Sequence, residues 1–148
     1  MPAIKITATK GLHQAAGTTT VPSGTLSGQK ACTVATTSAT TLVAADSGKV
    51  YFVNGASGHA LTLPTSNMKG LMYKFVMTNT TADCTIAAGS AIIKGEIACD
   101  AGTGVSVAGS TITMELAGVA GDWVELVSDG THWYASGYTA AAAGISVA

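Results

Sequence analysis

Charged residues are scarce in this chain. Asp, Glu, Lys and Arg make up 10% of its 148 residues and the formal net charge is -1, whereas about 25% of an average domain is charged. This balance favours neither nucleic acid nor a membrane surface as a partner. It leaves the exterior to Thr, Ser, Ala and Gly, which suits burial against other subunits because buried unpaired charges are costly. We therefore expect an oligomer, with a monomer as the open alternative.

Paired cysteines and long apolar runs are also missing. Cys32, Cys84 and Cys99 are odd in number and widely spaced, which fits neither a disulfide framework nor a CxxC metal site. We interpret them as small buried hydrophobes. No apolar run reaches the about 18 residues of a membrane span. The first residues, MPAIKITATKGL, do not resemble a signal peptide, so we expect synthesis inside the cell.

The usual patterns of catalytic and metal sites are absent as well. His13, His59 and His132 are scattered along the chain, without an HExxH spacing. No GxSxG elbow, GxGxxG loop or DxDxDG calcium loop is present, although each would be needed for its chemistry. The sequence therefore predicts no catalytic residue, no metal and no cofactor, and we expect that the protein is not an enzyme.

Short β-rich runs separated by turn residues are what the chain does contain, from Ser47 onward. They number about eight or nine, and no helix of ten residues or more is indicated. This pattern predicts an all-β fold, with a single antiparallel β-sandwich or barrel-like domain over residues 46–138. The runs before the last hairpin are Val50–Val53, Ala60–Leu63, Leu71–Thr78, Cys84–Ala87, Ala91–Ile97, Thr103–Val107 and Thr111–Leu116.

Both ends of the chain have few large side chains. Residues 1–45 are dominated by Thr, Ala, Gly and Ser, so we expect either an extended N-terminal arm that orders on contact with neighbours or a pair of weak edge strands. Residues 139–148 form a short tail. The tail is either a frayed end or a strand added to a neighbour.

The stretch GDWVELVSDGTHWYASG, residues 121–137, holds both tryptophans and predicts a β-hairpin. Asp129-Gly130 favours a two-residue type I′ turn. That register sets Leu126 opposite Trp133 and Val124 opposite Ala135, with all four on one buried side. The candidate core and hairpin residues are Val124, Leu126, Asp129, Gly130 and Trp133.

The other side of this hairpin is rich in aromatic residues. A small domain on its own seldom leaves such a surface in water. Core and interface anchoring is one interpretation, and stacking of Trp123, Trp133 and Tyr134 on sugars is the other. The candidate subunit-interface residues are Trp123, Glu125, His132 and Tyr134, with Val127 on the same side.

Three sequence blocks carry a resemblance when they are taken in order. They are TLVAADSGK from Thr41, LTLP from Leu61 followed by GLMYKFV from Gly70, and GDWVELVSDG from Gly121 with Trp133-Tyr134. Over residues 40–138 they resemble a repeated pattern in structural proteins of tailed bacteriophages. The region looks like the small β domain of phage head decoration (cement) proteins, which is also found in tail and fibre components.

The resemblance implies a structural protein of the virion with no catalytic residues. The expected role is capsid decoration, in which a homotrimer binds the major capsid protein on the outer surface of the head and stabilises the shell against DNA pressure. Such a protein is made in the host cytoplasm and resides on the capsid surface. The alternative is a tail- or fibre-associated module that binds a receptor or glycan.

Overall fold

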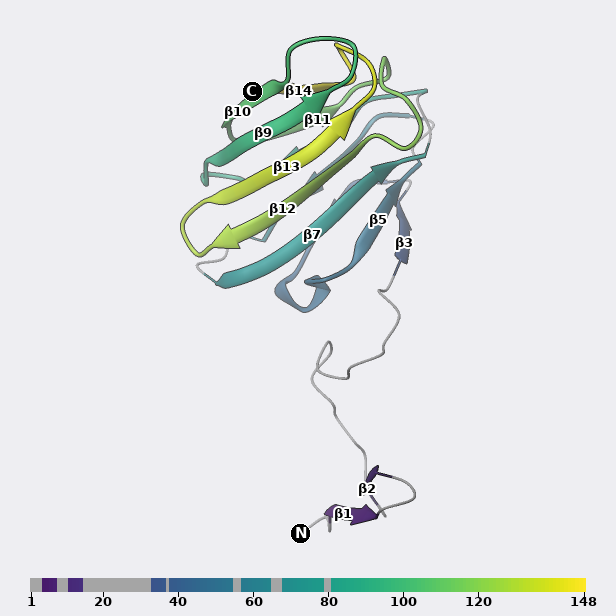
Figure 1. Cartoon of the computed structure of the whole chain (residues 1–148), viewed down its shortest axis with the longest axis vertical. Helices are drawn as coiled ribbons and strands as arrows, with labels where there is room; N and C mark the ends of the chain where they lie inside the picture. The colour runs from purple at the N-terminus through teal and green to yellow at the C-terminus, as the bar shows by residue number, and fades with distance from the viewer. Residues whose placement is uncertain are drawn as a thin grey trace.

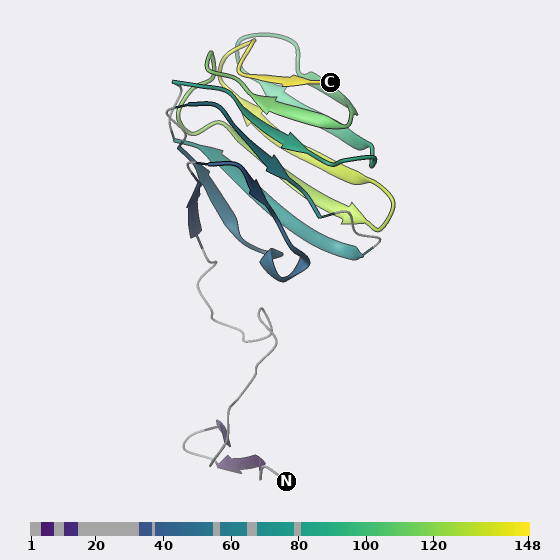
Figure 2. The same cartoon turned by 180° about the vertical axis from the view of Figure 1, so that it is seen from behind.

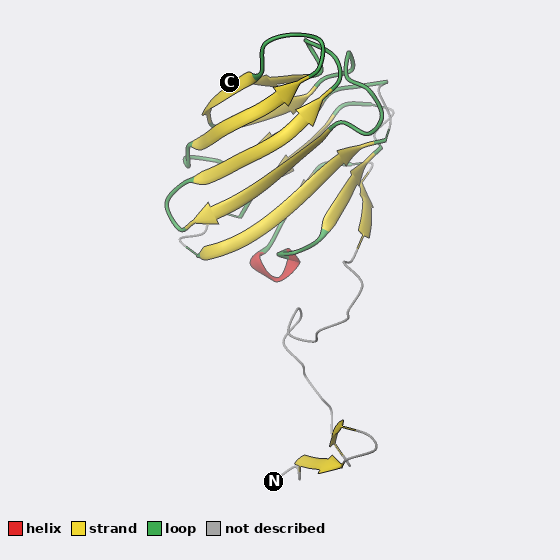
Figure 3. Cartoon of the chain, in the orientation of Figure 1, coloured by secondary structure: helices red, strands yellow, loops and turns green. Residues whose placement is uncertain are grey.

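The structure is a computed structural model that describes residues 4–7, 11–14, 33–36, 38–54, 57–64, 68–78 and 81–148. Strands dominate it, with one 3-10 turn, η1 (Ala44–Asp46) (Figure 3). The strands are β1 (Ile4–Thr7), β2 (Gly11–Gln14), β3 (Thr33–Thr36), β4 (Thr40–Thr41), β5 (Val50–Val53), β6 (His59–Thr62), β7 (Lys69–Met77), β8 (Cys84–Ala87), β9 (Ile93–Cys99), β10 (Val105–Gly109), β11 (Thr111–Met114), β12 (Trp123–Asp129), β13 (Trp133–Thr139) and β14 (Ile145–Val147).

Two sheets face each other across one core. The seven-stranded sheet has the order β10-β9-β13-β12-β7-β5-β3, and the five-stranded sheet has the order β14-β11-β8-β6-β4. Figure 1 looks onto the seven-stranded sheet, and Figure 2 shows the five-stranded sheet from behind. β1 and β2 pair only with each other among the described strands. The predicted all-β sandwich is confirmed, with more strands than expected.

The sheets are mixed, which corrects the expectation of antiparallel pairing. Strands β3 to β9 alternate between the two sheets along the chain. Each connection crosses from one sheet to the other, so the next strand in the same sheet runs in the same direction. Four pairs are parallel as a result: β3–β5, β5–β7, β4–β6 and β6–β8. A fifth parallel pair, β9–β13, joins strands that are farther apart in the chain.

The predicted hairpin is β12–β13, and it lies between β7 and β9 in the seven-stranded sheet. Its register differs from the prediction: Leu126 pairs with Ala135 and Ser128 with Trp133. A type I′ turn needs positive φ at both central residues, but the only described residues with positive φ are glycines, Gly130 among them. Residues 130–132 therefore form the connection in place of the predicted Asp129-Gly130 turn, and the Asp129 N–H donates to the His132 carbonyl at 3.1 Å.

Four aromatic rings from three strands pack together in the core. Tyr73 lies 6.5 Å from Tyr51 and 5.8 Å from Trp133, measured between ring centroids, and Phe75 stacks on Tyr51 at 5.5 Å. The Tyr73 hydroxyl donates a hydrogen bond to the Val43 carbonyl at 2.9 Å. Burial raises the pKa of this phenol to about 12. Aliphatic residues of both sheets surround the rings: Leu42, Val53, Leu61, Leu63, Leu71, Met77, Ile86, Ile93, Ile97, Val107, Ile112, Met114, Val124, Leu126 and Ile145.

Both ends of the domain extend beyond the predicted limits. β3 and β4 are the outer strands of the two sheets, and Leu42 after β4 is buried. For this part of residues 1–45 the edge-strand alternative applies, and the extended arm does not. Residues 139–148 are not a separate tail. β14 pairs with β11 of the same chain, and Ile145 is buried. The short Ile-Ser-Val run of β14 is stabilised by pairing with the edge of β11. The sequence alone does not indicate which strand offers that edge.

Asp122 joins three segments at one end of the sandwich. The carboxylate is buried. Its Oδ2 accepts the Val119 N–H at 3.0 Å and the Thr139 hydroxyl at 2.9 Å, while Oδ1 accepts the Ala140 N–H at 3.0 Å. These bonds connect the loop before β12 to the end of β13 and to the turn that leads into β14.

We predict that Asp122→Ala lowers the free energy of unfolding by about 2–4 kcal/mol, because the Val119 and Ala140 N–H groups lose their acceptor and the Thr139 hydroxyl keeps only the Ala141 carbonyl. Asp122→Asn should cost less, since the amide keeps one oxygen acceptor. Urea unfolding measures both, with Asp100→Ala at an exposed position as the control. Equal stability of Asp122→Ala and Asp100→Ala would contradict the role assigned to the carboxylate.

Candidate functional site: an open sheet face

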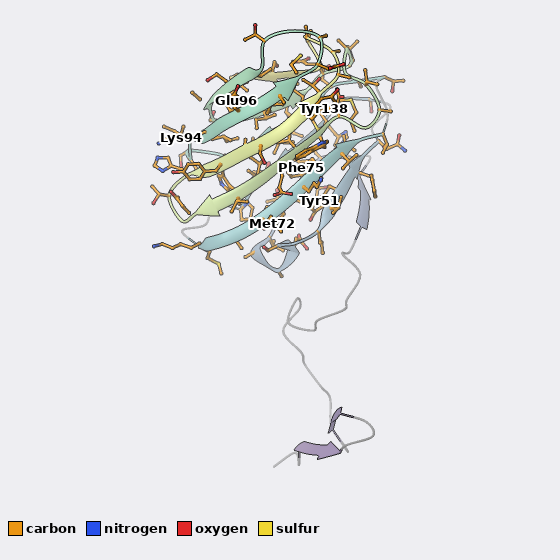
Figure 4. The ribbon with its side chains drawn as sticks, in the orientation of Figure 1. Tyr51, Met72, Phe75, Lys94, Glu96 and Tyr138 are labelled. Carbon is orange, nitrogen blue, oxygen red and sulfur yellow. The ribbon has the colours of Figure 1, made fainter. Side chains whose placement is uncertain are left out.

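The outward side of the seven-stranded sheet, called the open face below, is not covered by any described segment of the chain. Burial alternates along its strands: Leu71 and Tyr73 of β7 are buried, while Met72 between them is exposed. The strand pairing arranges the outward side chains in three rows, one of which crosses six strands and two of which cross five. Figure 4 views this face and labels Met72, Lys94, Glu96 and Tyr138.

The middle row is polar and crosses the sheet from β5 to β10. We call it the polar row. Three of the four charged side chains in the rows lie in it, and the fourth is Lys94 in another row. Each member of the polar row pairs with the next across neighbouring strands. In order they are Val50, Lys74, Glu125, Ser136, Glu96 and Ser106.

Two largely apolar rows flank the polar row. The aromatic row contains Phe52, Val76, Trp123, Tyr138 and Ala98. The tip row, nearer the β12–β13 connection, contains Met72, Val127, Tyr134, Lys94 and Ala108. Met72, Val127, Tyr134 and Tyr138 are between 37% and 46% exposed. Large apolar side chains thus form contiguous bands on this side, a feature typical of interaction surfaces.

Trp123 and Lys74 contact each other on the open face. The Lys74 Nζ lies 4.2 Å from the centroid of the Trp123 ring, within the range of a cation–π interaction. Lys74 also pairs in register with Glu125 on β12. The ammonium therefore occupies one side of the indole, and Trp123 is half-buried.

A second polar group forms at the hairpin connection. Asp129 Oδ1 accepts the N–H groups of Thr131 at 2.7 Å and His132 at 2.6 Å, and the carboxylate also accepts the Tyr134 hydroxyl. The N–H of His132, followed by that of Thr131, lowers the pKa of Asp129 to about 2. His132 Nδ1 lies 3.8 Å from the same carboxylate. The Asp129 side chain thus holds the connection between β12 and β13 in its observed conformation, which differs from the predicted type I′ turn.

The residues proposed from sequence separate as expected between the two sides of the hairpin. Val124, Leu126 and Trp133 are buried in the core, whereas Asp129 ends β12 and Gly130 begins the connection. The four interface candidates do not form one cluster. They are distributed as Trp123 in the aromatic row, Glu125 in the polar row, Tyr134 in the tip row and His132 in the connection.

Other members of the open face were not singled out from the sequence. Lys74, Glu96 and Tyr138 lie on β7, β9 and β13. The alternation of each strand indicates one outward side, but it does not say which strands are neighbours. The parallel pairing of β13 with β9, which places Glu96 beside Ser136, has no signal in the sequence.

A buried pair of a histidine and a cysteine lies in the other sheet. His59 Nε2 on β6 is 3.6 Å from Cys84 Sγ on β8, and His59 Nδ1 is buried without a hydrogen-bond partner. Burial lowers the pKa of His59 and raises that of the Cys84 thiol to about 12. Cys84 is a buried hydrophobe, as predicted. Cys99 is half-buried, and Cys32 lies outside the described residues.

We predict that stability falls as the pH drops below about 6.5, the ordinary pKa of histidine, because His59 is neutral when folded and takes up a proton when unfolded. The slope from this group is at most about 1.4 kcal/mol per pH unit. Urea unfolding of the wild type and of His59→Leu between pH 7.5 and 5 tests it. The variant should show the weaker dependence, and identical slopes would refute the assignment.

Comparison of the chain with protein families and with curated proteins finds no match. Over the residues that the structure describes, no group of three or more His, Cys, Asp or Glu side chains is placed to hold a metal ion. The same residues include no helix long and apolar enough to cross a bilayer.

Proposed function

We propose that the protein is a structural component of a phage virion, and specifically a capsid decoration protein. The observation that carries the proposal is the open face of a β-sandwich, on which apolar rows lie beside few charges. The resemblance of residues 40–138 to phage decoration domains supports the same role. In this role the partner is the major capsid protein, and the resemblance implies a homotrimer.

The work of such a protein is mechanical and needs no reacting group. Apolar surface removed from water contributes about 25 cal/mol per Å². Many copies bound across the joints between coat subunits therefore oppose their separation by packaged DNA. A chain with only 10% charged residues lowers the desolvation cost of such contacts, since few charges must leave water.

We predict that heads without this protein release their DNA at a lower temperature than complete heads. A dye that reports DNA release during heating measures the difference, with heads reloaded with purified protein as the control. Reloading should restore the higher temperature. An unchanged release temperature in heads that lack the protein would refute capsid stabilisation.

A tail or fibre module that binds a receptor or glycan is the second candidate. Exposed Tyr134 and Tyr138 on the same face as Trp123 favour it, because aromatic rings stack on sugars. Lys74 over the Trp123 ring leaves less of that indole for a sugar. Labelled protein over the whole head supports decoration. Label on the tail, together with glycan-array binding that Trp123→Ala abolishes, supports the module.

A further inference from the structure

We propose that the open face binds the open face of a second copy of this chain, about a twofold axis that runs parallel to β12 and β13 and passes between them. The two sheets then pack face to face, and Lys74 of each copy faces Glu96 of the other. This inference concerns the protein by itself and does not depend on the capsid role. A twofold pair would replace the trimer that the resemblance implies, and in the capsid role the coat protein and the second copy would compete for the open face.

The order of strands sets which residues meet across such an axis. β13 and then β9 lie on one side of the axis, and β12 and then β7 lie on the other. A twofold rotation therefore places β12 over β13 of the partner and β7 over β9. Each row faces the same row of the other copy in reverse order. Aligned sheets in sandwiches pack within about 30° of each other, so the rows stay in approximate register.

The polar row becomes complementary to itself under this rotation. Lys74 on β7 faces Glu96 on β9, and Glu125 on β12 faces Ser136 on β13. Neither glutamate forms an ion pair within the described part of the chain. Within one copy Lys74 and Glu96 are three strand spacings apart, about 14 Å. Their charges can therefore meet closely only between copies.

The flanking rows also match under the same rotation. In the aromatic row Trp123 faces Tyr138, and in the tip row Val127 faces Tyr134. Lys94 faces Met72 at the rim of the patch, where its methylenes lie on the thioether while the ammonium reaches water. Apolar rows thus meet apolar rows, and an interface of this kind keeps charges mostly at positions where they are paired or solvated.

Self-complementarity of this kind is the requirement of an isologous interface, in which one patch binds its own copy. A twofold axis perpendicular to the strands, running along the polar row, would not make the patch self-complementary. It would place Lys74 against Lys74 and Glu125 against Glu125. A different protein partner would need no such internal match. The patch spans six strands, about 24 Å, which is the scale of a small standard interface. The charge pattern therefore favours a second copy.

The test is a charge exchange measured by sedimentation equilibrium of the full chain. Lys74→Glu places Glu against Glu96 and Glu96→Lys places Lys against Lys74, twice per dimer in each case. Like charges brought together across an interface cost several kcal/mol, so each single variant should raise the dimer Kd by about tenfold or more. The double variant restores opposite charges and should return the Kd to within about threefold of the wild type.

Two controls separate the interface from the fold. Glu115→Lys changes a charge on the five-stranded sheet side, at the end of β11, and should leave the Kd unchanged. Circular dichroism and thermal unfolding check that every variant is folded. A wild-type monomer at tens of micromolar, a wild-type trimer, or a folded double variant that is no better than the single variants would each overturn the proposal. Loss of capsid stabilisation with an intact dimer would refute only the proposed function.

Discussion

The insertion of one hairpin into the seven-stranded sheet is the constraint on which the rest of the fold depends. β12 binds β7 on one side and β13 binds β9 on the other. The two halves of the sheet are therefore connected only through this hairpin. Trp133 packs on Tyr73 below the sheet, and Asp122 and Thr139 fix the opposite end to the closing turn. A loss of pairing here would separate β9 and β10 from the other strands of this sheet.

The same pleat that builds the core also builds the open face. Because side chains alternate along a strand, each buried residue of the hairpin is followed by one that faces outward. Leu126 is buried while Val127 is exposed. A chain with abundant charge would place ion pairs on this outer side. Here the low charge leaves apolar rows on either side of a single polar row, and this pattern gives the face its capacity to associate.

The sequence predicted correctly which hairpin residues face the core, but it did not predict which residues pair across the hairpin. The predicted pairs were wrong by two residues, and a slip of two leaves every side chain on the same face. Leu126 and Trp133 are therefore in the core as predicted. The register failed because the Asp129 carboxylate accepts the N–H groups of Thr131 and His132. This local hydrogen bonding favours a longer connection than the Asp-Gly pair indicates.

The sequence by itself determined that the chain forms β-structure, which hairpin residues are buried, and that charges are few, because alternation and composition are local properties. Only the tertiary structure decided the strand order, the parallel pairing of β9 with β13 and the place of β14 beside β11. These depend on connections that cross the sandwich and on edges formed by distant segments. The rows of the open face depend on the same long-range pairing, which brings Lys74, Glu125 and Glu96 into one line.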